Sequence, residues 1–445
     1  MNKKESIKSF LLLFLFFLSF LFGMYSYHSR NIIYKVSRMV YHKLSSDETK
    51  DKISESSRLN IVTKKQAHKI DMADINSLPY LQGVVSAPPR TGVTIHKSEK
   101  AYAGLNLYVS SHKPSAYLLD MEGKVLHEWH CPFEKVWPSQ KLNNPHASEK
   151  HKKYWSDVYL YPNGDVLAIF PRIGIIKLDK HSNLIWSQMN NAHHDAYVSE
   201  NGKIYVLTEK FIKPNYNHEF NIRWSGKIYE DFISVLSPEG ETIREISILK
   251  CFMNSNYAPV FYHGPKKGDC LHTNTVEVIE KPHSRSSSIF NKGLILISVR
   301  EYNLLALIDP VKEKVTWTMS GMWIKQHHPT LVEDGNLMVF DNLGKKEKSR
   351  IIEIDPLTKK IEWIYEGNEQ HPFYTKVGGI CQRLPNGNTL ITEYDKGRIF
   401  EVNELNEIVW EFINPEILEE ENLTATVSMM VRVKASYADW LKEKR

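Results

Sequence analysis

The chain has 445 residues and is 42% hydrophobic, enough to bury a sizeable core in one large domain or two ordinary ones. The net charge of +5 is unevenly distributed, because residues 1–70 hold 13 Lys and Arg against 5 Asp and Glu, which leaves 44 against 47 in the remainder. That nearly neutral remainder lacks the basic excess of nucleic-acid-binding domains, so no nucleic-acid partner is expected.

Residues 1–30 hold the most apolar segment of the chain. From Ser9 to Tyr25 the sequence is uncharged and almost wholly apolar, which is close to the shortest length that spans a bilayer. No small-residue cleavage site follows it, as a signal peptide would require. We therefore predict a single N-terminal transmembrane helix that remains attached as a membrane anchor.

Residues 31–90 are predicted to connect the membrane anchor to the rest of the chain. Ile33, Val36, Val40 and Leu44 fall at helical spacing, with basic residues on the other faces, which favours a short juxtamembrane amphipathic helix. The residues after it are polar and charged without sustained periodicity, as expected of a stalk.

A repeated unit begins near residue 104. Each copy has a short apolar strand, an Asn-Gly or Asp-Gly turn and two or three further strands, the last of which often ends in Trp. Six copies are expected at residues 104–130, 155–188, 193–246, 271–319, 326–367 and 378–415. Four short strands in each 40–55 residues are typical of propeller blades. We predict an all-β fold, with a six-bladed β-propeller as the catalytic domain over 91–430 and a C-terminal tail over 431–445.

Three histidines fall at related positions of this repeat. His194 lies seven residues before the Asn201-Gly202 turn, His327 lies seven before the turn at Asp334, and His272 opens a third unit. Equivalent positions of repeats share one surface, and the innermost strands of blades line a central channel. The three imidazoles are therefore expected to converge near the axis.

Two further residues accompany the histidines. Asn274 shares a strand face with His272, and Arg300 ends an apolar strand of the same unit. Imidazoles, an amide and a guanidinium suit an anion with charged oxygens and could move a proton near neutral pH. Three histidines could instead bind a metal, and Asp195 could serve as a further ligand. Because the other accompanying residues are Arg and Asn rather than carboxylates, we expect neither a metal nor another cofactor.

Several segments resemble the bacterial arylsulfotransferase (aryl-sulfate sulfotransferase) family. The resemblance covers about residues 90–430 and is carried by Gly92–Tyr108, Leu118–Trp129, His193–Asp195, His272–Asn274, Gln326–His327 and Gln382–Ile391. It implies a six-bladed propeller and an enzyme of the periplasm. Together with the predicted anchor, which departs from the free periplasmic state of the family, it orients the chain in the inner (cytoplasmic) membrane with the propeller facing the periplasm or cell exterior. It also implies sulfuryl transfer from an aryl sulfate to a phenolic acceptor, without a nucleotide donor, by a ping-pong mechanism through a sulfohistidine.

The resemblance also implies roles for the candidate residues. His327 is the implied nucleophile, His194 contacts the sulfuryl group, and His272 and Asn274 match a His-x-Asn pair in which His272 moves the phenolic proton. Arg300 matches an arginine that holds sulfate oxygens. The family pattern Gln-His-Asp departs here to Gln-His-His, with His328 in place of the aspartate.

Several alternatives stay open at this level. A non-catalytic propeller that binds an anionic ligand or an envelope partner, and a transferase or lyase that acts on envelope glycans, both fit the same channel. Cys251 and Cys270 bracket a long loop and are either disulfide-bonded or unpaired. Tyr302, Phe373 and Tyr374 follow channel strands and are expected to line an aromatic pocket.

Overall fold

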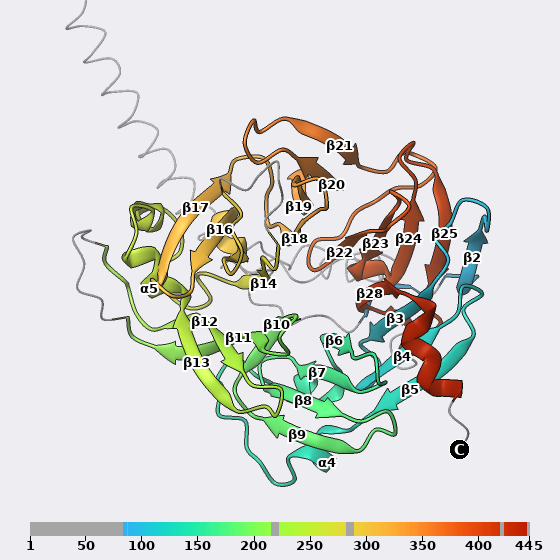
Figure 1. Ribbon diagram of the computed structural model, residues 1–445, viewed down its shortest axis with the longest axis horizontal. Coiled ribbons are helices and arrows are strands. Elements are labelled where there is room, and N and C mark those ends of the chain that lie inside the picture. The colour runs from blue at the N-terminus through green and yellow to red at the C-terminus, as the bar shows by residue number, and fades with distance from the viewer. Residues whose placement is uncertain (1–82, 87, 215–221, 282–288, 419–421, 443–445) are drawn as a thin grey trace, which may run out of the picture. The chain divides into compact units, whose positions relative to one another are not determined.

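Six antiparallel sheets, five of four strands and one of five, follow one another along the chain and form the blades of a propeller (Figure 1). The computed structural model describes residues 83–86, 88–214, 222–281, 289–418 and 422–442. Each blade is named here in the order from its innermost strand to its outermost strand. Blade 1 comprises β28 (Val427–Val433), β3 (Leu105–Ser110), β4 (Ser115–Leu119) and β5 (Val125–His130). Blade 2 comprises β6 (Asp157–Leu160), β7 (Val166–Phe170), β8 (Gly174–Leu178) and β9 (Leu184–Gln188).

The other four blades repeat this order. Blade 3 comprises β10 (Ala192–Val198), β11 (Ile204–Ile212), β12 (Ile228–Leu236) and β13 (Thr242–Ser247). Blade 4 comprises β14 (Thr273–Val278), β15 (Ile295–Val299), β16 (Leu304–Asp309) and β17 (Lys314–Ser320). Blade 5 comprises β18 (His327–Leu331), β19 (Leu337–Lys345), β20 (Lys348–Ile354) and β21 (Ile361–Tyr365). Blade 6 comprises β22 (Ile380–Arg383), β23 (Thr389–Glu393), β24 (Arg398–Val402), β25 (Ile408–Ile413) and, outermost, β2 (Gly92–His96).

Short elements connect the blades. A small separate sheet joins β1 (Gly83–Ser86), β27 (Leu423–Ala425) and β26 (Ile417–Leu418). The helices are α4 (Phe133–Val136) and α5 (Ile248–Met253), with the 3₁₀ turns η2 (Glu149–Lys153), η3 (Ala258–Tyr262), η4 (Arg300–Tyr302), η5 (Tyr394–Lys396) and η6 (Ala435–Lys442).

The blades close into a ring through the end of the chain. Innermost strands of successive blades contact one another from β6 around to β22, and β28 contacts both β22 and β6. Because β28 pairs with β3, a strand from the C-terminal end completes the first blade. The innermost strands remain sheet edges, but they are short and lie against one another around the axis, where another chain cannot easily pair with them.

The apolar core is divided among the blade interfaces. Each of six clusters of buried side chains draws on two neighbouring blades. Second strands such as β7, β15 and β23 are buried along their whole length, whereas outer strands such as β9 are largely exposed. The continuous apolar runs of the sequence are therefore strands covered on both faces by adjacent blades.

Three blade-terminal tryptophans connect their blade to the next one. The indole N–H of Trp129 donates to Gly164 O at 2.9 Å, that of Trp186 to Pro238 O at 3.1 Å, and that of Trp410 to Met121 O at 2.9 Å. Gly240 has a φ of +87°, and a Cβ on it would lie 2.5 Å from the Trp186 ring. Glycine is required there both by the backbone conformation and by the close approach.

The structure differs from the sequence prediction at the C-terminal boundary. The expected end of the propeller at residue 430 falls inside β28, and the expected tail begins with the second half of that strand. The remainder forms η6, whose Trp440 is 7% exposed and packs against blade 1 at 5.8 Å from the Trp129 ring. The tail is therefore an integral part of the closing blade.

The predicted anchor at 1–30 lies outside the described residues, as does nearly all of the predicted helix and stalk at 31–90. In the described part of the chain, no helix is both long enough and apolar enough to cross a bilayer. On this finding the predicted single-pass location in the inner membrane is withdrawn, together with the predicted membrane partner.

The four cysteines are free and buried. Cys251 and Cys270 therefore hold unpaired thiols, and no disulfide joins the ends of the loop between them.

Candidate active site

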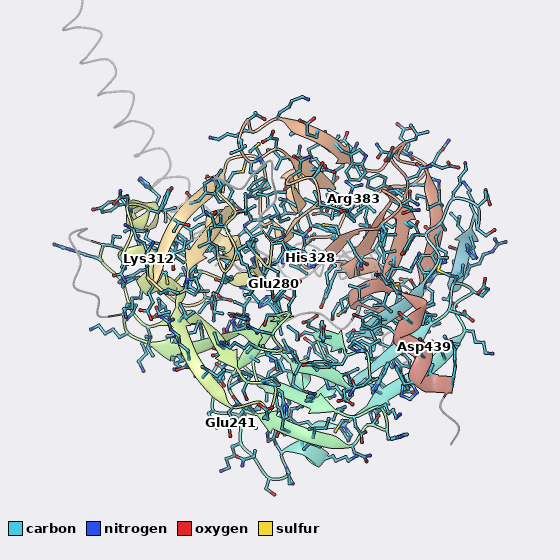
Figure 2. The ribbon with its side chains drawn as sticks, viewed as in Figure 1. Glu241, Glu280, Lys312, His328, Arg383 and Asp439 are labelled. Atoms are coloured by element: carbon cyan, nitrogen blue, oxygen red, sulfur yellow. The ribbon has the colours of Figure 1, made fainter. Side chains whose placement is uncertain are left out.

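A cavity of about 280 Å³ lies among the innermost strands of the ring. Its lining includes three of the five predicted site residues, His194, Asn274 and His327. His272 and Arg300 are absent from the lining but lie beside these residues through the contacts described below. Figure 2 places His328, another lining residue, near the centre of the ring, whereas Glu241, Lys312 and Asp439 lie toward its edge.

The backbone is unusual where the imidazoles enter. His194, His272 and His328 have φ values of 56°, 50° and 43°, in the left-handed region that non-glycine residues rarely adopt. The β-pairing of β10, β14 and β18 to their neighbours is irregular at these points. Each such residue costs about 1–3 kcal/mol, and clusters of them occur at functional sites. Three blades thus carry the same irregularity at one end of the channel.

Side chains bridge the inner strands where the ladders are interrupted. Asp157 accepts the N–H of Ala196 at 3.3 Å, and Asp195 accepts that of Val276 at 2.8 Å. Burial raises the pKa of Asp195 to about 6. Asp195 is therefore an acceptor that joins two blades, and this contact accounts for the carboxylate that had kept metal binding open.

Two of the three predicted histidines contact each other directly. The Nε2 atoms of His194 and His272 are 3.1 Å apart, and His194 Nδ1 lies 2.7 Å from His193 Nδ1. On the other side of the His272 ring, Nδ1 lies 2.5 Å from Asp269 Oδ2. Burial and the Arg300 charge lower the pKa of His272 to about 4, although Asp269 opposes the shift. In the protein without substrate these rings are therefore neutral near pH 7.

His327 is held in one orientation. Its Nδ1 lies 2.7 Å from Asn342 Oδ1 and 3.0 Å from the Lys325 carbonyl oxygen, and both oxygens are acceptors. The Asn342 amide nitrogen donates to Thr375 O and Gly378 O, which fixes the amide oxygen toward the ring. Nδ1 must therefore carry the hydrogen, and the lone pair lies on Nε2.

The other nitrogen of His327 is buried and, within the described residues, has no hydrogen-bond partner. Burial and the Arg300 charge lower the pKa of His327 to about 3. A neutral imidazole with an available lone pair in a cavity has the properties of a nucleophile.

Asn274 and Arg300 are fixed around this ring. The Asn274 amide donates to Gln326 O at 2.9 Å, which ties β14 to the residue before His327. The Arg300 Nε and a terminal nitrogen donate to Glu301 Oε1 at 3.0 and 2.7 Å. The Arg300 backbone N–H donates to His272 O at 3.3 Å, and the Arg300 charge lowers the pKa of both His272 and His327.

Comparison with known families identifies the relatives of this chain. The family described as arylsulfotransferase (ASST) matches residues 158–415, more than half of the chain. The chain belongs to the arylsulfotransferase family. The matched region covers blades 2 to 6, which hold all five predicted site residues, and a search of curated proteins found no match.

Solved structures share the general architecture at low similarity. A protein of unknown function from Bacteroides caccae aligns with a TM-score of 0.47 at 9% identity, covering 74% of this chain and 98% of that one. A streptogramin B lyase gives 0.41 at 13%, covering 79% and 96%. Virginiamycin B lyase from Staphylococcus aureus gives 0.38 at 13%, covering 74% and 89%. At these scores, none of the three bears on the activity.

The site also contains residues that the sequence prediction missed. Arg172 donates to Glu209 Oε2 at 2.5 Å and to Asp269 Oδ2 at 3.2 Å, which ties the partner of His272 to blade 2. Asp269 stands three residues before His272, a spacing that offers a signal, but Arg172 and Asn342 carry none because their roles depend on pairing between strands.

The aromatic lining was predicted wrongly. Phe373 is 2% exposed in the core between blades 5 and 6, and the Tyr302 hydroxyl donates to Pro265 O at 2.9 Å. None of Tyr302, Phe373 and Tyr374 is among the residues that line the cavity. Its aromatic residues are instead Tyr159, Tyr394 and Tyr437. Tyr437 belongs to η6, so the closing segment of the chain contributes to the site.

Proposed function

We propose that the protein transfers a sulfuryl group from an aryl sulfate ester to a phenolic acceptor through a covalent intermediate on His327. The observation that carries this proposal is the single orientation of the His327 ring, with its hydrogen held at Nδ1 by two acceptors and Nε2 left with its lone pair. Membership of the arylsulfotransferase family supports the reaction class.

In the first half-reaction, His327 Nε2 attacks sulfur while the bond from sulfur to the aryl oxygen breaks. The ester is an anion, so its binding adds a negative charge beside His272 and favours the protonated ring. The Asp269 carboxylate, which lies against Nδ1 of His272, stabilises that imidazolium. His272 then passes the proton from Nε2 to the departing phenolate, and the products are a neutral phenol and sulfohistidine.

In the second half-reaction, the acceptor phenol occupies the position left by the phenol that was released from the ester. Neutral His272 takes its proton as the phenolic oxygen attacks sulfur, and the bond between sulfur and His327 Nε2 breaks. The protonated His272 is then restored together with the free nucleophile. Arg300 and His194 are suited to stabilise the charge on the sulfuryl oxygens in both steps.

A chromogenic assay tests the proposal. Incubation with 4-nitrophenyl sulfate and a phenol is expected to release 4-nitrophenol, and His327→Asn should lower kcat by about 10³-fold or more. His181→Asn, at an exposed histidine on blade 2, is the matched control and should retain full turnover. Wild-type turnover in His327→Asn would overturn the assignment.

Mass spectrometry distinguishes the other interpretations. With the ester and no acceptor, the peptide that contains His327 should gain the mass of one SO₃ group. A propeller that only binds an anion predicts saturable binding without that adduct. Activity on sulfated saccharides, with none on aryl sulfates, would favour an enzyme that acts on envelope glycans.

A further inference from the structure

Two buried carboxylates oppose each other on neighbouring strands of blade 3. Glu209 on β11 and Asp231 on β12 are direct cross-strand partners, and each is 1% exposed. Like charges at directly opposite positions destabilise a sheet, and burial increases the repulsion. A cation between the two carboxylates would relieve this repulsion.

Only one of the pair has a cationic side chain beside it among the contacts of the described residues. Glu209 is bound by Arg172 at 2.5 Å and accepts the Asn144 amide at 2.7 Å. Asp231 uses Oδ2 to accept the Thr273 N–H at 2.7 Å, and its other oxygen, Oδ1, has no hydrogen-bond partner within the described part of the chain.

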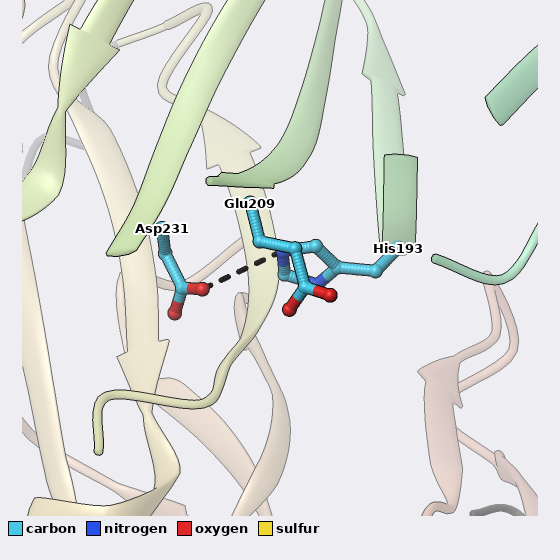
Figure 3. Close-up of side chains that lie close together, drawn as sticks. All are labelled: His193, Glu209 and Asp231. Atoms are coloured by element: carbon cyan, nitrogen blue, oxygen red, sulfur yellow. Dashed lines mark ion pairs between the residues drawn. The ribbon is translucent and has the colours of Figure 1, made fainter. Parts of the chain in front are cut away.

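The unpartnered oxygen faces an unpartnered imidazole nitrogen. His193 Nε2, from β10 and 1% exposed, also lacks a hydrogen-bond partner within the described residues, and it lies 3.6 Å from Asp231 Oδ1 (Figure 3). That separation exceeds the usual length of a hydrogen bond. It is close to the roughly 3.4 Å between two ligands of one tetrahedral zinc ion, for bonds of about 2.1 Å.

The charges of the surrounding residues point the same way. Asp269 is a third carboxylate in this network, and Arg172 binds both Asp269 and Glu209. Metal ligands bind in their deprotonated form, and with neutral imidazoles the three ionised carboxylates and one guanidinium would carry a charge of −2, which one divalent cation neutralises.

We propose that His193, Glu209 and Asp231 bind a divalent metal ion of the zinc class. One ligand atom from each residue lies within 4.8 Å of the other two, and all three side chains are buried. Glu209 keeps capacity for a metal because each carboxylate oxygen has two lone pairs. One imidazole nitrogen with carboxylate oxygens suits Zn²⁺, with Mn²⁺ as the nearest competitor.

The metal would act on the active site through one hydrogen bond. An ion on His193 Nε2 fixes the hydrogen of that ring on Nδ1, which then donates to His194 Nδ1 at 2.7 Å. The hydrogen of His194 is then held on Nε2, the atom that faces His272. This consequence rests on the proposed function, whereas metal binding itself does not.

Metal content is the first test. The full chain, without an affinity tag, is treated with a chelator, dialysed and titrated with Zn²⁺ in competition with a chromogenic chelator. One tightly bound zinc per chain and a higher Tm in its presence are expected. Co²⁺ in place of zinc should give visible absorption bands. A wild-type chain that takes up no zinc and keeps the same Tm would overturn the proposal.

Substitutions locate the ion. Asp231→Asn retains an acceptor for the Thr273 N–H, and we expect it and His193→Asn each to weaken zinc binding by about 100-fold or more. His96→Asn is the matched control, because His96 Nδ1 lies 3.6 Å from Glu122 Oε1 at the surface. Tight zinc in both buried-site variants would overturn the assignment, and so would its loss in His96→Asn alone.

The two proposals can fail independently. His327→Asn should bind zinc like the wild type while losing turnover, which separates the metal site from the nucleophile. If zinc binds but no aryl sulfate is turned over, the metal site stands and the proposed function falls. If turnover occurs in a wild-type chain that binds no zinc, the metal site falls.

Discussion

The two halves of the ring use one backbone position in different ways. In blades 3, 4 and 5 the entry of the inner strand carries His194, His272 and His327, whereas the corresponding positions of blades 2 and 6 carry Ser156 and Gly379. All but His272 line the same cavity. The scaffold therefore supplies the positions. Blades 3 to 5, which carry the proposed catalytic histidines, are called the reactive half, and the blades that carry Ser156 and Gly379 belong to the structural half.

The bridges between blades show a second contrast. In the reactive half several of the acceptors are carboxyl groups, as with Glu277, which accepts the Leu331 N–H at 3.3 Å, although the Thr275 hydroxyl accepts the His328 N–H at 3.0 Å. Where the ring closes, the acceptor is the neutral Thr392 hydroxyl, which takes the Met430 N–H at 3.2 Å. Burial raises the pKa of the bridging carboxyl groups, to about 6 for Asp195 and about 8 for Glu277, so this half of the ring is expected to respond to pH.

The largest expected effect is on catalysis in the reactive half. His272→Asn removes the group proposed to carry the phenolic proton, so kcat should fall by about 10²–10⁴-fold. Steady-state rates with several phenolic esters measure it, and the loss should be smallest for the ester whose phenol is most acidic. An equal loss for all esters would contradict a role in proton transfer, and His181→Asn again serves as the control.

In the structural half, the largest expected effect is on stability. Gly379 has a φ of +109°, and a Cβ there would lie 2.5 Å from the Phe340 ring, so Gly379→Ala should lower the free energy of unfolding by about 2–4 kcal/mol. Gly293→Ala is the control, with a φ of +86° and no atom within 4 Å, and should cost only the backbone strain. Equal losses in urea denaturation would show that the close approach to Phe340 adds nothing.

A smaller effect is expected at the residue that orients the nucleophile. Asn342→Leu removes the nearer of the two acceptors at His327 Nδ1 and should lower kcat by about 10–100-fold, with little change in KM, because the Lys325 carbonyl oxygen alone then orients the ring. Asn342→Asp keeps an acceptor and should restore part of the rate. A change in KM alone would argue for a role in binding.

Asn342 also illustrates what the sequence could and could not predict. The blades and the position of the histidines follow from turn spacing, which is local, and a repeat carries that spacing to a common edge. The orienting contact between Asn342 and His327 joins neighbouring strands, and Asp269 approaches His272 through a loop insertion. Strand β28 could not be placed because it pairs with residues more than 300 positions earlier.

Stability should depend on pH through Glu277. Burial raises the pKa of this carboxyl to about 8 from 4.5, so the folded protein keeps a proton that the unfolded chain releases. The resulting stability is complete below pH 4.5 and is lost as pH rises toward 8, by about 4–5 kcal/mol. Glu277→Gln should remove this dependence in urea denaturation at pH 5 and pH 8, whereas Thr392→Val in the structural half should leave it. If the free energy of unfolding changed equally with pH in the wild type and in Glu277→Gln, the assignment of this dependence to Glu277 would be wrong.

The smallest expected effect is an absence of pH dependence in the first half-reaction. The lowered pKa of His327, about 3, keeps the ring neutral far below the usual imidazole range, so release of the phenol should not decline between pH 7 and pH 5 for want of the nucleophile. Arg300→Gln removes a cation that lowers this pKa and should shift the acid limb of kcat/KM toward neutral pH, whereas Arg300→Lys should shift it less. A wild-type acid limb near pH 6.5 would mean that His327 titrates as an ordinary histidine, and the contrast between the two halves of the ring would lose its electrostatic basis.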